Sequence, residues 1–279
     1  MRKQILAATI GIFLASGSAA LAGTLTMVGT PKLGAVLQGD EIVVSGTYEI
    51  ENKGDETAFD VFPGLEFDKW SWVGKPARVD AGKKQEWSLS EKIKLSVLDK
   101  ELPSQGRLSF LTRRYYKDVN GYAFSAADLT NFYIGVFTPQ QQVAMQVPDL
   151  QVQQEVDGDG QEFTGKITAR NLGKEPVKAR ISIFTARELS PEEAEPRWLE
   201  VPTGKTANIR FHLKNVSGLV GSTYAVFGLV EWQHEGIRLS ANSSSVVSIH
   251  RVELMHWFLI AAALILVVMG LVIYLKVFR

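Results

Sequence analysis

The sequence predicts an all-β protein, with two tandem antiparallel β-sandwiches followed by one C-terminal transmembrane helix. Three observations lead to this fold class. Segments with alternating apolar and polar residues recur at short intervals. Several motifs occur once in each half of the chain, and a long uncharged run lies near each end. The length of 279 residues allows two ordinary domains, and an apolar content of 46% excludes an intrinsically disordered chain.

The first 22 residues have the pattern of a signal peptide. Two basic residues follow the initial methionine closely, an apolar core covers residues 5–15, and the ALA sequence at 20–22 fits a small-x-small cleavage site. We therefore expect residues 1–22 to be removed and the mature chain to start at Gly23.

The first β-sandwich is expected over residues 23–140. From Ile42 to Ile50 apolar or small residues occupy every second position, which is typical of a strand with one buried face. The NKG sequence at 52–54 then supplies turn chemistry, because Asn and Gly tolerate positive φ. The NG sequence at 120–121 suits the tight turn of a hairpin.

The second β-sandwich is expected over residues 148–250, after a semi-extended linker at 141–147. Its motifs repeat those of the first in the same order. GTYEIENKGDE at 46–56 matches GKITARNLGKE at 165–175, and VDAGK at 79–83 matches VPTGK at 201–205. A third match joins YYKDVNGYAFSA, which starts at Tyr115, to VEWQHEGIRLSA, which starts at Val230. Three ordered matches indicate a duplicated domain.

The two copies differ mainly in their loops. The spacing of the matches places seven extra residues in the first copy between Gly82 and Gly121, so its connection near Ser96–Gly106 is the longer one. In the second copy, the SPEE sequence at 190–193 fits a capping box and predicts one helical turn.

The C-terminal run predicts a transmembrane helix at 256–275. Trp257 to Leu275 are 19 residues without a charge, which as a helix would span roughly 28 Å, close to the hydrocarbon thickness of a bilayer. Basic residues follow at once, which places a cytoplasmic tail at 276–279 by the positive-inside rule. The predicted location is the inner membrane, crossed once, with the N-terminal domains in the periplasm or outside.

The repeated unit resembles a known group of bacterial domains. A strand that ends in N-x-G, followed by an Ala- and Val-rich strand, occurs as NKGDETAFDV and NLGKEPVKARI, and an xxGK sequence follows later in both copies. These features are similar to bacterial repeats of the CARDB, or cell-adhesion-related, type. The resemblance implies an immunoglobulin-like sandwich for each copy. It implies no catalytic residues. The roles that it implies are those of a spacer, an adhesive module or an accessory part of an envelope complex.

Composition argues against several functions. Four of the 30 basic residues lie in the two terminal segments, so 26 remain against 30 acidic residues, which disfavours nucleic acid as the main partner. The chain has no Cys, which excludes disulfides and thiolate metal sites. Its four His lack metal-ligand spacing, and no catalytic motif occurs. We therefore predict no enzymatic activity, no cofactor and no metal.

Aromatic residues in the first copy are the candidate partner-binding residues. Trp70 and Trp72 are two apart and share one face of an extended segment. If this face is exposed, it could bind a partner protein or stack on sugar rings. The alternative is that it packs into the core. A second candidate patch is the RRYY sequence, whose alternative is a solvated strand edge. It contains Arg113, Arg114, Tyr115 and Tyr116.

The sequence therefore predicts a membrane-anchored extracytoplasmic interaction or scaffold protein, as an accessory component of a bacterial envelope complex. Its expected partners are the membrane, through the C-terminal helix, and a protein of the envelope. The alternative is a carbohydrate-binding module that uses exposed Trp residues. An enzyme is a third hypothesis, and it requires a deep pocket in which acidic side chains converge.

Overall fold

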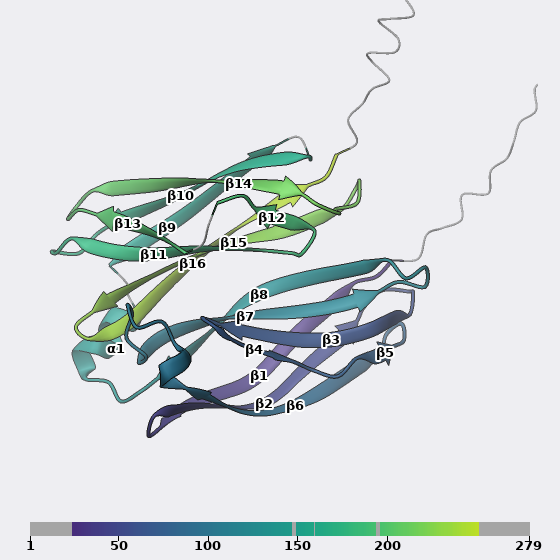
Figure 1. The fold of residues 1–279 in the computed structure, drawn as a ribbon, viewed down its shortest axis with the longest axis horizontal. Coiled ribbons are helices and arrows are strands. Elements are labelled where there is room, and N and C mark those ends of the chain that lie inside the picture. The colour runs from purple at the N-terminus through teal and green to yellow at the C-terminus, as the bar shows by residue number, and fades with distance from the viewer. Residues whose placement is uncertain (1–23, 147–148, 159, 194–195, 251–279) are drawn as a thin grey trace, which may run out of the picture.

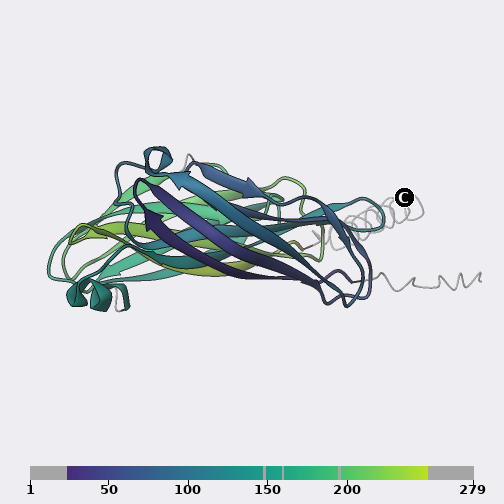
Figure 2. The same ribbon diagram turned by 90° about the horizontal axis from the view of Figure 1, so that it is seen from below.

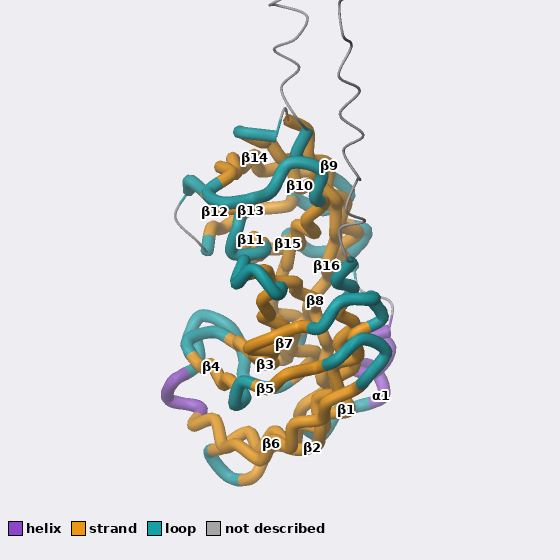
Figure 3. The backbone as a smooth tube through the Cα atoms, turned by 90° about the vertical axis from the view of Figure 1, so that its right-hand side faces the viewer, coloured by secondary structure: helices purple, strands orange, loops and turns teal. Residues whose placement is uncertain are grey.

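The computed structural model describes residues 24–146, 149–158, 160–193 and 196–250. Two β-sandwiches lie side by side, and their strands run mainly along the long axis of the molecule (Figures 1 and 2). Seen from one end, the second sandwich stacks on the first through its strand β16 (Figure 3).

In the first sandwich, a three-stranded antiparallel sheet faces a sheet built around β3 and β7. The three-stranded sheet has the order β1-β2-β6, with β1 at Met27–Gln38, β2 at Glu41–Asn52 and β6 at Lys84–Lys94. The facing strands are β3 (Ala58–Phe67), β4 (Trp70–Val73), β5 (Ala77–Val79), β7 (Gly106–Lys117) and β8 (Ala123–Ile134). A short 3-10 helix, Leu95–Val97, follows β6. The apolar face of each strand points between the sheets, where Ile42, Leu65 and Phe110 are fully buried.

The second sandwich has the same two-layer plan. One sheet has the order β12-β14-β10-β9. Its strands are β9 (Leu150–Gly158), β10 (Glu162–Asn171), β12 (Leu189–Pro191) and β14 (Thr206–Asn215). The other sheet contains β11 (Val177–Thr185), β13 (Arg197–Val201), β15 (Thr223–His234) and β16 (Ile237–Ser248). Its core includes Ile167, Phe211 and Trp232, all fully buried.

A buried asparagine makes the same bonds in both sandwiches. The Asn52 amide donates to the carbonyl oxygens of Glu56 (2.7 Å) and Val79 (3.1 Å), and its side-chain oxygen accepts from the Gly54 N–H. The amide of Asn171, the matched residue, likewise donates to two carbonyl oxygens at 2.7 and 3.0 Å and accepts one N–H. Each asparagine therefore satisfies the backbone of one turn and one neighbouring strand, as a duplicated domain requires.

Among the residues that the structure describes, one backbone bridge pairs a strand of the first sandwich with a strand of the second. Arg238 of β16 pairs with Gly106 of β7 in parallel. This bridge links the β13-β11-β15-β16 sheet of the second sandwich to β7 and β3 of the first. Within each sandwich the described strand pairs are antiparallel, as predicted, and the parallel bridge is a contact between the sandwiches.

Two local predictions also differ from the structure. Residues 139–146 form the α-helix α1, where an extended linker was expected. The Met145 side chain of this helix is buried in the core of the second sandwich, so tertiary packing favours the helix. The predicted helical turn at 190–193 does not form, because its first two residues belong to strand β12, which pairs with β14.

The predicted fold class needs a correction at its last element. Within the described ranges, no helix is long and apolar enough to cross a membrane. The α-helix α1 has eight residues, or about 12 Å, against about 30 Å for the hydrocarbon core of a bilayer. The predicted transmembrane helix at 256–275, the tail at 276–279 and the signal peptide at 1–22 all fall outside the described residues. The predicted single-pass location in the inner membrane, with the membrane as a partner, is therefore not supported.

Candidate functional site

The long connection between β6 and β7 is one of the parts of the first sandwich that contact the second. Asp99 in this connection accepts a hydrogen bond from the Arg180 guanidinium, and the Gln105 carbonyl oxygen accepts one from the Arg238 N–H at 2.7 Å. Leu98 and Leu102 anchor the same connection, since each is only 5% exposed. The extra residues of the first copy thus form an interdomain contact.

Four buried charged side chains form a cluster between the sandwiches. Asp68 comes from the turn between β3 and β4, and Arg180, Glu231 and Arg238 come from β11, β15 and β16. The exposed fractions of these four side chains range from 1% to 7%. Arg180 lies 2.7 Å from Asp68 and 2.6 Å from Glu231.

Arg238 completes the cluster by contacting the same two carboxylates. Its guanidinium lies 3.0 Å from Asp68 and 2.7 Å from Glu231, and it also stacks over the Phe67 ring. Each arginine therefore binds both buried carboxylates, as its forked donor geometry allows, and Arg180 binds Asp99 as well. Asp99, which is 24% exposed, adds a fifth charge at the edge of what we call the interdomain ion cluster.

The pKa values in this cluster reflect mutual stabilisation. Burial alone would raise the pKa of Asp68, but the hydrogen bonds and positive charges of Arg238 and Arg180 outweigh it and lower the pKa to about 2. Burial opposes the positive charge of both arginines, yet the neighbouring carboxylates raise their pKa values. Asp68 and the two arginines are thus held in their charged forms.

Backbone geometry lets the sandwiches approach closely beside the cluster. Gly106 has φ +128°, and a Cβ at this position would lie 2.0 Å from the Arg238 carbonyl oxygen. Only glycine fits both the backbone conformation and this contact. Nearby, the hydroxyl groups of Ser109 and Ser240 are 2.8 Å apart.

Further contacts join the sandwiches farther along their shared side. The Arg113 guanidinium donates to the Thr185 carbonyl oxygen at 2.7 Å. The buried Glu188 carboxylate accepts from both the N–H and the hydroxyl group of Ser125. Because these contacts extend from the ion cluster to β8, they hold the two sandwiches in one relative orientation.

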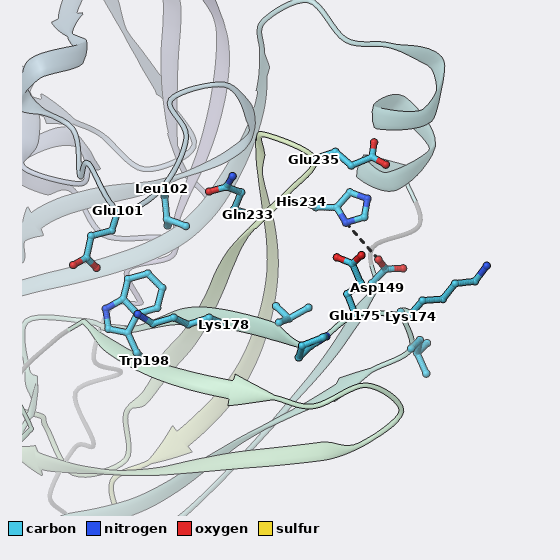
Figure 4. A pocket seen from close by; sticks show the side chains of 14 residues that line it. Glu101, Leu102, Asp149, Lys174, Glu175, Lys178, Trp198, Gln233, His234 and Glu235 are labelled. Carbon is cyan, nitrogen blue, oxygen red and sulfur yellow. Dashed lines mark ion pairs between the residues drawn. The ribbon is translucent and has the colours of Figure 1, made fainter.

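An open cleft of about 820 Å³ lies at the junction of the two sandwiches (Figure 4). Glu101 and Leu102 of the long connection form one wall. The second sandwich forms the rest, with Trp198 of β13 opposite the turn between β15 and β16. We call this space the junction cleft. A smaller cleft of about 250 Å³ lies beside the ion cluster and is lined partly by Phe184 and Leu229.

The predicted tryptophan pair lies on the core face of β4. Trp70 pairs with Phe67 and Trp72 with Leu65, both of which are buried. Each Trp is half-buried and packs against the core of the first sandwich, and Trp70 meets Phe110 edge to face at 6.3 Å. The hairpin that carries the two tryptophans also carries Asp68 at its turn.

The RRYY sequence lies on β7, and its side chains have partners within the chain. Arg113 binds Glu66 as well as the second sandwich, and Arg114 binds the Met27 carbonyl oxygen and the Asp128 carboxylate. The two arginine side chains are only 14% and 13% exposed.

The tyrosines of this sequence are half-buried. Tyr115 stacks on Phe62, and Tyr116 stacks on Phe124. Burial is the main cause that raises the pKa of both hydroxyl groups. The RRYY sequence thus lies on the opposite side of β3 from the strand β4 that carries the Trp residues, and Tyr116 packs against the same buried cluster as Trp72.

The sequence analysis missed the ion cluster and the junction cleft. Arg180, Glu231 and Arg238 lie in strands and Asp68 in a turn, and no sequence motif links the four residues. One signal was available, since the longer connection of the first copy marked the segment that forms the contact. Across the described ranges, no group of three His, Asp or Glu side chains could hold a metal ion.

No family model matches this chain, and no curated protein does. Among solved structures, red sea bream transglutaminase is similar over 81% of this chain and 31% of its own length, with 10% identity and a TM-score of 0.26. The YadV chaperone is similar over 79% of this chain and 99% of its own, with 13% identity and a TM-score of 0.31. The Pseudomonas aeruginosa CupB2 chaperone is similar over 77% of this chain and 98% of its own length, with 10% identity and a TM-score of 0.29. The chain thus spans about a third of the transglutaminase, and similarities this low assign neither family nor function.

Proposed function

We propose that this protein is a non-catalytic binding or scaffold protein of the cell envelope, and that its two sandwiches present one rigid surface to a protein partner. The signal-peptide pattern at 1–22 supports export from the cytoplasm. The junction cleft is the proposed binding surface.

The observation that carries this proposal is the way the cleft is built. Its walls come from both sandwiches, and the ion cluster that joins them is close to the cleft along the chain. Asp99, Arg180 and Glu231 of the cluster are each two residues from a residue that lines the cleft, namely Glu101, Lys178 and Gln233. A cleft whose walls are already fixed loses little conformational entropy when a partner binds, which favours affinity. Two sandwiches serving only as independent spacers would not require such a contact.

The charged groups near the cleft also support a non-catalytic role. Asp68 and Glu231 are each bound by two arginines, so their negative charges are neutralised and their lone pairs occupied. A general acid or base needs a pKa near the operating pH, whereas the pKa of Asp68 is about 2.

Site-specific photocrosslinking in the producing cells tests this proposal. A photoreactive phenylalanine analogue replaces Trp198 in the full-length chain, and the matched control carries it at Val36, an exposed residue of β1 outside the cleft. We expect one adduct of defined mass from the Trp198 position and none from Val36. Equal labelling at both positions, or no adduct at Trp198, would refute a binding role for the cleft.

A further inference from the structure

The side chains around the junction cleft carry more negative than positive charge. The acidic residues come from four segments and from both sandwiches, so the charge surrounds the space instead of lying on one strand. Lys174 extends away from the other labelled side chains (Figure 4). The acidic residues are Glu101, Asp149, Glu175 and Glu235, and the basic residues are Lys174 and Lys178.

Three of these carboxylates have no cationic partner of their own. Glu101, Glu175 and Glu235 are exposed, and in the described part of the chain none of the three takes part in an ion pair. Asp149 faces His234, whose Nδ1 lies 3.7 Å from the Asp149 carboxylate. The cleft therefore offers unneutralised negative charge to whatever enters it.

The cleft already holds one cation against its aromatic wall. The Lys178 Nζ atom lies 4.6 Å from the centroid of the Trp198 ring, in the geometry of a cation–π contact. This contact is independent of the carboxylates, and it shows that the Trp198 ring is placed to receive a positively charged group. Lys178 is itself exposed, so a guest cation can compete with it for this position.

Apolar surface lies beside these charges. Most of it comes from the second sandwich, where Leu172 is 51% exposed and Val177 lies nearby in the chain, whereas Leu102 on the first-sandwich wall is almost buried. A guest that fits this lining combines a positive charge with neighbouring apolar groups.

We infer that the junction cleft receives a basic, extended segment of the partner protein, with a lysine or arginine side chain lying between Trp198 and the carboxylates. This inference rests on the proposed function and specifies the chemistry of the partner. Because Glu101 comes from the first sandwich and the other three acids from the second, the full charge is present only while the two sandwiches remain in contact.

Fluorescence anisotropy with labelled octapeptides tests the inference on the full-length chain. One probe alternates lysine with valine, and the comparison probe alternates glutamate with valine. We expect only the lysine probe to bind, with an affinity that falls as salt is raised. Preferential binding of the glutamate probe, or equal binding of both, would overturn the inference.

Removing acidic or basic side chains from the cleft should change the affinity for the lysine probe in opposite directions. Combining Glu101→Gln, Glu175→Gln and Glu235→Gln should weaken binding of the lysine probe about tenfold, from the sum of three exposed ion pairs. Lys178→Met removes the competing cation and should strengthen binding severalfold. If Lys178→Met weakens binding instead, the cleft does not select cations.

The matched control neutralises the same number of acids elsewhere. Glu86→Gln, Glu155→Gln and Glu192→Gln change the net charge equally but lie outside both clefts, and they should change the affinity less than twofold. An equal loss in this control would show that the overall charge of the chain, and not the cleft, attracts the probe.

The outcomes separate the inference from the proposed function. If Trp198 crosslinks a partner in cells but the lysine probe does not bind, the proposed function stands and the basic chemistry of the partner is wrong. If Trp198 crosslinks nothing, the proposed function itself fails.

Discussion

Arg238→Met tests whether the interdomain ion cluster stabilises the protein. Arg238 is 1% exposed and binds Asp68 and Glu231, so its loss leaves two buried carboxylates that share only Arg180. Removing one partner from a buried ion pair costs about 3–5 kcal/mol, because an uncompensated charge stays buried. For a chain of this size the melting temperature should fall on the order of 10 °C.

Urea unfolding of the full-length chain measures this loss of stability. In the parent protein the contacts between the sandwiches should make both unfold together. In Arg238→Met we expect a lower midpoint and two separable transitions, because each sandwich has its own core. Adding Glu231→Gln to Arg238→Met removes one unpaired charge and should restore about 1–2 kcal/mol.

An exposed ion pair supplies the control. Lys32 lies 3.2 Å from Glu49 but is 56% exposed, so Lys32→Met should cost less than about 1 kcal/mol. If Arg238→Met costs no more than Lys32→Met, the cluster does not hold the sandwiches together and the reasoning is refuted.

Three further predictions concern the same contacts and the repeated turns. Gly106→Ala should destabilise the chain by about 1–3 kcal/mol more than Gly121→Ala in urea unfolding, because both have positive φ but only Gly106 meets backbone within 4 Å; equal losses would contradict this. Asn52→Ala and Asn171→Ala should each cost about 2–3 kcal/mol and agree within about 1 kcal/mol, since they lose matching bonds; a larger difference would contradict their equivalence. The pKa of Asp68 is lowered on folding, so its contribution of about 2 kcal/mol should be present above pH 4 and lost as the pH falls towards 2; an Asp68→Asn variant should not show this part of the loss.

Most strands could be predicted because their cause is local. Residues 42–50 alternate between the core and the surface, and the structure places them in β2 with Ile42, Val44, Tyr48 and Ile50 fully buried. The turns after Asn52 and Asn171 could be predicted for the same reason, since one side chain and its neighbours determine them.

The cluster and the cleft could not be predicted, because their cause is distant along the chain. Arg180 and Asp68 are 112 residues apart, and the sequence around each gives no sign of the other. For Trp70 and Trp72, the sequence predicts the local geometry but not the burial of the side chains. Their two-residue spacing predicts a shared face, but whether that face is core or surface depends on which sheet covers it.

The charges at the junction make the two sandwiches chemically unequal. Arg180, Arg238 and Glu231 all belong to the second sandwich and together carry one net positive charge on a buried face. Asp68 of the first sandwich neutralises that charge, and the hairpin that carries it has two tryptophans packed on the core. An unpaired buried charge is costly. The face of the second sandwich that carries Arg180 and Arg238 is therefore electrically neutral only when the first sandwich covers it with Asp68. The two sandwiches therefore work as one unit, and the unequal charges that join them line the smaller cleft.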